Sequence, residues 1–209
     1  SGHLSLKAWY ATPSNKDNAD SFPAVVYFHS GHAFGGSDFD EARVFLDAGF
    51  AVMTPMLRGE NGNPGNFEMF WGEFDDGIAA VEWLASQPNI DRDHIYTFGH
   101  SIGGGLSALL SLADESVPIR HGGSYGGLYP AEIFHEWKTT CPFDTSDKTE
   151  CSLRTLQTNT RSMRRKHFGY LGIADPLNSM FRTSGEQLRP QTVPGDHFSG
   201  LRPALANYV

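Results

Sequence analysis

The chain has 209 residues, of which 39% are hydrophobic and 19% charged, a composition typical of a globular protein. Its 16 Lys and Arg residues are outnumbered by 24 Asp and Glu residues, and the formal net charge of −8 disfavours nucleic acid and anionic membrane surfaces as partners. No apolar run of the sequence approaches the ~18 residues that span a bilayer, so we expect no membrane span and a single domain over residues 1–209.

Short apolar runs alternate with helical patterns along the first half of the chain. Residues 24–28 form an apolar, β-rich run that predicts a strand, and residues 38–49 show a capped helical pattern. Residues 50–53 predict the next strand. After a loop rich in Gly, Asn and Pro, apolar residues at helical spacing predict a second helix over residues 74–88.

The same alternation continues in the second half. Strands are predicted at residues 95–98, 168–173 and 191–193, and helices at residues 102–112 and 178–188. Repeated strand and helix units are typical of a mostly parallel twisted sheet with helices on both faces. The sequence therefore predicts the α/β class.

Residues 129–166 interrupt this alternation. The segment is polar and rich in turn residues, which predicts an insertion or lid-like excursion above the sheet. It holds the two cysteines, Cys141 and Cys151, and their polar surroundings favour a disulfide and hence a periplasmic or secreted protein. Two free thiols in a cytoplasmic protein are the alternative.

Two serines, Ser101 and Ser124, each lie in a G-x-S-x-G pattern. Ser101 stands between a predicted strand and a small-residue helix, as a nucleophile at a sharp strand-to-helix turn requires. Ser124 is followed by Gly126-Gly127-Leu128-Tyr129-Pro130, a stretch that cannot open a regular helix. We therefore predict Ser101 as the nucleophile. Tyr125 and Tyr129 are expected near the mouth of the same crevice as substrate-pocket candidates, with ordinary packing as the alternative.

A serine hydroxyl becomes a good nucleophile only when a base removes its proton. His197 lies in a turn-rich loop after the last short strand, from which it can reach Ser101, although a histidine in a loop can also be incidental. Asp175 directly follows a strand and is the expected orienting acid. Asp196 is the alternative, but it would have to fold back on its own neighbour. The chain order Ser101, Asp175, His197 is the order typical of such folds.

The negative oxygen of the reaction intermediate needs backbone N–H donors. One is expected from Ile102, the residue after the nucleophile, and the second from Gly31 or His32 in the loop after the first buried strand. His29 in the same loop is expected to brace it by hydrogen bonding. Phe34 is a candidate to line the substrate pocket.

With these residues placed, the chain resembles prolyl-oligopeptidase-like catalytic domains and dienelactone-hydrolase-like esterases. The resemblance is most specific over residues 57–105, and it extends to 28–31, which is similar to the oxyanion loop, and to 195–198, which is similar to the histidine loop. It implies an α/β-hydrolase fold and a serine hydrolase. Ser30 departs from the pattern because those families have glycine there, and residues 129–166 match no motif of theirs.

The resulting hypothesis is a serine esterase that cleaves small carboxylic esters through an acyl-enzyme. It needs no cofactor, and the sequence has no H-E-x-x-H metal motif. A peptidase of the prolyl-oligopeptidase kind, acting on amides, and a non-catalytic binding domain with a hydrolase fold are the alternatives. The sequence does not indicate an oligomeric state.

Overall fold

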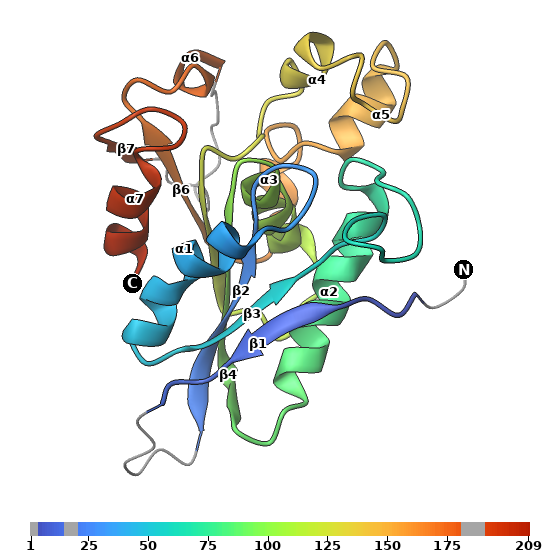
Figure 1. The fold of residues 1–209 in the computed structure, drawn as a ribbon. Coiled ribbons are helices and arrows are strands. Elements are labelled where there is room, and N and C mark those ends of the chain that lie inside the picture. The colour runs from blue at the N-terminus through green and yellow to red at the C-terminus, as the bar shows by residue number, and fades with distance from the viewer. Residues whose placement is uncertain (1–3, 15–20, 181–190) are drawn as a thin grey trace.

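A seven-stranded sheet forms the centre of the computed structural model, which describes residues 4–14, 21–180 and 191–209 (Figure 1). Its strand order is β1-β3-β2-β4-β5-β6-β7, with β1 antiparallel to β3 and all other neighbours parallel. The strands are β1 (Ala8–Ala11), β2 (Phe22–Phe28), β3 (Ala51–Pro55), β4 (Ile90–His100), β5 (His121–Tyr125), β6 (His167–Gly172) and β7 (Gln191–Val193). The predicted mostly parallel α/β sheet is confirmed.

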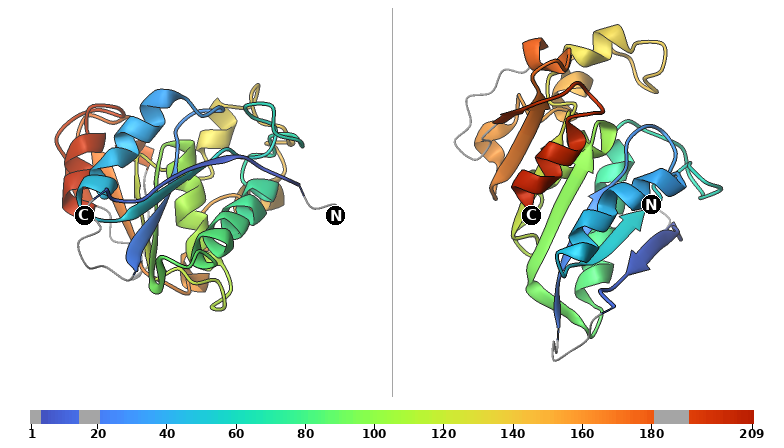
Figure 2. Two further views of the ribbon diagram at one scale, coloured as in Figure 1. Left: turned by 60° about the horizontal axis from the view of Figure 1, so that its bottom comes forward. Right: turned by 60° about the vertical axis from the view of Figure 1, so that its left-hand side comes forward.

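Helices cover both faces of this sheet (Figure 2). Helices α1 (Gly36–Asp47) and α7 (Leu201–Tyr208) pack on one face, and α2 (Trp71–Ala85) and α3 (Ile102–Leu109) pack on the other. The remaining helices are short: η1 (Leu110–Leu112), α4 (Ile133–Glu136), α5 (Lys148–Leu153), η2 (Thr160–Ser162) and α6 (Leu177–Met180). None of the helices in the described residues is both long and apolar enough to cross a membrane.

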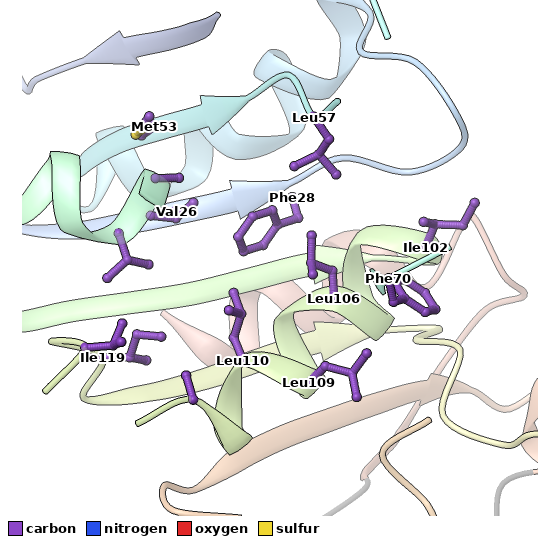
Figure 3. Packing of buried hydrophobic residues seen from close by; sticks show 14 of the residues in the cluster. Val26, Phe28, Met53, Leu57, Phe70, Ile102, Leu106, Leu109, Leu110 and Ile119 are labelled. Carbon is purple, nitrogen blue, oxygen red and sulfur yellow. The ribbon is translucent and has the colours of Figure 1, made fainter. Parts of the chain in front are cut away.

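Strand β2 shows how the sequence builds the two cores. Successive side chains of a strand point to opposite faces, so Val25 and Tyr27 join the core under α1 and α7. Val26 and Phe28 join the larger core under α2 and α3, where Phe28 lies close to Leu106 of α3 (Figure 3). Apolar residues at every position of this strand are therefore required by burial on both faces.

The strand order also determines where a site can form. The chain leaves β2 toward β3 on one side and later returns to β4 on the other, so the connections diverge between β2 and β4. In such sheets ligands bind at the carboxyl ends of the strands where the connections diverge. The loop after β2 and the residue after β4, Ser101, meet at this point.

The segment 129–166 carries α4 and α5, which lie above the carboxyl ends of the strands (Figure 1). Its last residues run down to the start of β6, where the amide of Arg164 donates to the carbonyl of Ser111 at 2.9 Å. The predicted disulfide within it is wrong, because Cys141 and Cys151 are both free. Cys151 is the buried side chain of α5 and belongs to the core, and Cys141 packs against that core. Each therefore behaves as a small apolar side chain, and burial raises the pKa of both thiols.

Two segments near the C-terminus differ from the sequence prediction. The C-terminal helix α7 was not predicted, although Leu201, Ala204 and Leu205 place an apolar stripe on the core. The predicted helix over residues 178–188 overlaps α6, and its part from 181 onward lies outside the described residues.

Arg165 holds together the short helix η1 and the loop that follows it. Its buried guanidinium donates five hydrogen bonds of 2.8–3.3 Å to backbone carbonyls. The acceptors are Leu110, Ala113, Asp114, Val117 and Ile119. All five N–H donors of the side chain are therefore used on backbone carbonyls, and those of Leu110, Asp114 and Val117 also accept from backbone amides.

We expect Arg165→Met to lower the free energy of unfolding by about 3 kcal/mol or more, because five backbone carbonyls, among them those of Ala113 and Ile119, lose a charged hydrogen-bond donor. The matched control is Arg164→Met, since Arg164 is 48% exposed and contacts Glu115 at 3.8 Å. That change should alter stability by less than about 1 kcal/mol. Urea unfolding of both variants measures the difference, and equal losses would contradict this role of Arg165.

Candidate active site

Ser101 occupies a strained turn between β4 and α3. Its backbone has φ 56° and ψ −116°, a region that residues with a side chain rarely adopt. The amide of Ser101 donates to the carbonyl of Tyr125 at 2.9 Å. Glycine is required at Gly99, where a Cβ would lie 2.7 Å from the nitrogen of Gly104, and at Gly103, where it would overlap the carbonyls that end β2. The turn thus lifts the Ser101 hydroxyl above the sheet.

The structure brings Ser101, His197 and Asp175 into one hydrogen-bonded row. Nε2 of His197 lies 2.9 Å from Oγ of Ser101, and Nδ1 lies 2.8 Å from Oδ2 of Asp175. The Asp175 side chain is fully buried, and its Oδ1 accepts from the amide of Leu177 at 2.9 Å. The three residues follow β4, β6 and β7, so parallel strands deliver them to one edge of the sheet.

Gly126 gives this row the room it needs. It has φ 56°, and a Cβ there would lie 2.8 Å from Cε1 of His197 and 3.2 Å from Oδ2 of Asp175. The alternative acid, Asp196, is engaged elsewhere, because its Oδ1 accepts from the amides of Phe198 and Ser199 at 3.1 and 2.9 Å. Asp196 therefore closes the turn that carries His197 and does not contact the imidazole through its carboxylate.

The predicted oxyanion loop follows β2 and starts against the first turn of α3. Gly31 has φ 72°, and His32 is exposed with its ring against Phe67 at 4.9 Å between centroids. Phe34 is buried, and its amide and carbonyl both bond to the side chain of Asn61, at 3.0 and 2.9 Å. These backbone bonds anchor the loop, and the buried ring of Phe34 packs against the rings of His29 and Trp9, at 5.7 and 6.2 Å between centroids.

A buried ion pair supports the same loop. Nε2 of His29 lies 2.9 Å from Oε1 of Glu60, and Nδ1 lies 2.9 Å from the carbonyl of Ser30. Burial by itself would lower the pKa of His29. The hydrogen bond to Glu60 and its negative charge outweigh the effect of burial, so the net result is a raised pKa. Both ring nitrogens face acceptors, which is the arrangement of an imidazolium. Glu60 was not found from the sequence, because only the fold brings it to His29.

The second glycine-flanked serine lies inside the protein. Ser124 is fully buried, and its Oγ hydrogen-bonds to the hydroxyl of Tyr129 and, at 2.6 Å, to Nε2 of His167. Tyr125 and Tyr129 are both buried as well, so their rings do not line a solvent-facing mouth. The Ser124, Tyr129 and His167 cluster was not predicted, since nothing in the sequence spacing links His167 to a serine 43 residues earlier.

The buried histidines make stability depend on pH. Burial lowers the pKa of His167 to about 3 and that of His100 to about 4, whereas an unfolded histidine titrates near 6.5. Below about pH 6.5 the unfolded chain therefore binds protons that the folded chain does not. The contribution of the neutral buried histidines to the free energy of unfolding is complete above that pH. It is lost as the pH falls, by about 1.4 kcal/mol per pH unit for each histidine.

We expect His167→Gln to flatten this dependence. Gln retains a group that can hydrogen-bond to Ser124 but takes up no proton, so the slope of unfolding free energy between pH 6 and 4 should fall by about 1.4 kcal/mol per unit. Urea unfolding of the variant and the parent protein across this range measures the difference. Parallel curves would contradict a neutral His167.

A serine, a histidine and an aspartate joined in this order, at the carboxyl ends of a mostly parallel sheet, define a serine hydrolase of the α/β-hydrolase fold. Sequence comparison agrees with this class. The chain belongs to the X-Pro dipeptidyl-peptidase (S15) family, because residues 2–118, more than half of its length, match that family.

Individual proteins that are similar to this chain are at most 30% identical to it over the aligned residues in the three comparisons that follow. An uncharacterized peptidase of Bacillus subtilis, YtmA, is 30% identical over 140 residues, which is 65% of this chain and 52% of that protein. The chain thus spans about half the length of this curated relative. Acylaminoacyl peptidase of Pyrococcus horikoshii superposes with a TM-score of 0.73 at 16% identity over 97% of this chain and 38% of that one. Est1E of Butyrivibrio proteoclasticus, solved with ferulic acid, gives 0.73 at 17% identity over 98% and 92%. These structures establish a shared fold.

Proposed function

We propose that this protein hydrolyses carboxylic esters through an acyl-enzyme formed on Ser101. The observation that carries the proposal is the continuous row of hydrogen bonds from Ser101 through His197 to Asp175, at 2.9 and 2.8 Å, which begins at a strained backbone turn. A binding domain without catalytic activity would gain nothing from the strained backbone at Ser101 or from its hydrogen-bonded alignment with His197 and Asp175.

The mechanism follows from the atoms that face each other. Oγ of Ser101 attacks the ester carbonyl carbon while Nε2 of His197 takes its proton, and Asp175 holds the imidazolium that forms. His197 returns the proton to the leaving alcohol as the carbon–oxygen bond breaks. Water, deprotonated by His197, then attacks the carbonyl carbon of the acyl-enzyme. The bond from that carbon to Oγ of Ser101 breaks, His197 returns the proton to Oγ, and the carboxylic acid leaves.

Backbone donors would stabilise the negative oxygen formed at each step. We assign one N–H to Ile102, at the start of α3, and the second to Gly31 or His32 in the loop that the His29–Glu60 pair supports. A single donor of this kind is worth about 10²–10³ in rate.

The surroundings of Ser101 favour an apolar substrate. Phe198 is 73% exposed, and its ring centroid lies 5.3 Å from that of His197, so it offers an apolar surface beside the base. Arg58, in the loop after β3, is engaged by Asp76 of α2 at 2.7 Å. An ester with an uncharged, apolar acyl or alcohol group fits such a setting.

An amide substrate is the second candidate, favoured by membership of a peptidase family and by the relatives named as peptidases. A p-nitrophenyl ester and a p-nitroanilide with the same acyl group separate the two. We expect kcat/KM to be higher for the ester and to rise with acyl length before it levels off. An anilide rate that equals the ester rate would favour the peptidase.

A further inference from the structure

The loop that carries His197 is held from below by two side chains of the sheet. It runs from Pro194 to Gly200 and connects β7 to α7. His100, at the end of β4, bonds through Nε2 to the carbonyl of His197 at 2.8 Å. Tyr125, at the end of β5, donates its hydroxyl to the carbonyl of Asp196. Two consecutive carbonyls of the loop therefore each accept a hydrogen bond from a neighbouring strand.

Tyr125 reaches this carbonyl through a space that only glycines leave. Its ring is fully buried, and a Cβ at Gly172 would lie 2.6 Å from its hydroxyl oxygen. A Cβ at Gly200 would overlap the same hydroxyl. The backbone carbonyl of Tyr125 also accepts from the amide of Ser101 at 2.9 Å. One residue thus contacts both the turn of the nucleophile and the loop of the base.

His100 makes its bond in a defined protonation state. A carbonyl oxygen can only accept, so Nε2 of His100 carries the proton. Burial lowers the pKa of His100 to about 4, and the groups that face it are His197 and Asp175. Burial, together with the charges of Asp175 and Asp196, raises the pKa of Tyr125 to about 12. Both donors therefore stay neutral and protonated across the range in which a serine hydrolase works.

We propose that His100 and Tyr125 are positioning residues that act as one clamp on the 194–200 loop and fix the imidazole of His197 between Ser101 and Asp175. Neither touches the substrate. The inference rests on the proposed function, because it assigns the clamp to the base of that mechanism. The side chain of His197 is only 21% exposed and bonds to Ser101 and Asp175, and its orientation also depends on the position of the backbone that carries it.

The test compares Tyr125→Phe, which removes one oxygen atom, with His100→Leu and with the double variant. A misplacement of the base by about 1 Å costs about 10²-fold in rate. We expect each single change to lower kcat about tenfold or more, with KM within about twofold, because the substrate contacts remain. The double variant should lose more than the product of the two single losses, since each donor alone still holds the loop.

Three further measurements separate positioning from a general loss of structure. His100→Gln places an amide N–H where Nε2 stood and should recover most of the kcat lost in His100→Leu. Tyr208→Phe removes another buried tyrosine hydroxyl, bonded to the carbonyl of Thr97 at 3.1 Å, and should leave kcat unchanged. The downfield proton NMR signal of the bond between His197 and Asp175 should broaden in Tyr125→Phe and stay sharp in Tyr208→Phe.

The outcomes for the clamp and for the proposed function are distinguishable. If Ser101→Ala and His197→Ala lose activity while Tyr125→Phe and His100→Leu keep the parent kcat, the clamp is refuted and the function stands. The clamp is also refuted if Tyr208→Phe loses as much kcat as Tyr125→Phe. If Ser101→Ala keeps activity, the proposed function fails, and with it the base that the clamp would position.

Discussion

Replacing Ser101 with alanine should lower kcat for a p-nitrophenyl ester by about 10⁵-fold and leave KM within a few-fold. The change deletes the oxygen that attacks the carbonyl, while the oxyanion donors and the apolar surroundings that bind the substrate remain. The residual rate should then come from water held in the same site. Steady-state kinetics on the purified variant, with its melting temperature as a check on folding, give this result directly.

The chain supplies a matched control in its second glycine-flanked serine. Ser124→Ala removes a buried hydroxyl that bonds to Tyr129 and His167, so it should cost some stability and keep kcat within about threefold. A loss of activity in Ser124→Ala equal to that in Ser101→Ala would reverse the assignment of the nucleophile.

Replacing Asp175 with asparagine should lower kcat by about 10⁴-fold. The amide still accepts from Leu177 through its oxygen, so the loop should keep its shape. Its N–H₂ group, however, faces Nδ1 of His197, which then must accept, and the ring proton moves to Nε2. A histidine in that tautomer cannot take the proton of Ser101.

Asp196→Asn is the control for this change. Its oxygen can still accept from the amides of Phe198 and Ser199, so we expect a loss of kcat below about tenfold. The pair of variants decides between the two candidate acids. Equal losses in both, or a greater loss in Asp196→Asn, would contradict the role given to Asp175.

Local sequence signals were sufficient for the elements that position Ser101. The run at residues 95–98, two flanking glycines and a small-residue helix are all close in sequence, and the structure extends the strand to Ile90–His100 without changing the turn. Asp175 and His197 followed from chain order, because each ends a strand of a parallel sheet and such ends share one edge. The structure places both within hydrogen-bonding distance of their predicted neighbours.

Contacts between distant segments could not be predicted. His29 meets Glu60, and His100 meets the carbonyl of His197, only after strands from different parts of the chain are aligned. The predicted disulfide failed for a different reason: the polar sequence neighbours of Cys141 and Cys151 suggested that the two thiols are exposed. In α5 those neighbours face outward and Cys151 faces the core, because a helix separates adjacent residues by about 100°.

The most direct test of the account is to label the folded protein with a fluorophosphonate and to locate the adduct by peptide mass spectrometry. We predict one adduct per chain on the peptide that contains Ser101, lost in Ser101→Ala and retained in Ser124→Ala. An adduct on Ser124, or no adduct on a protein that remains folded, would contradict the central claim that Ser101 is an activated nucleophile.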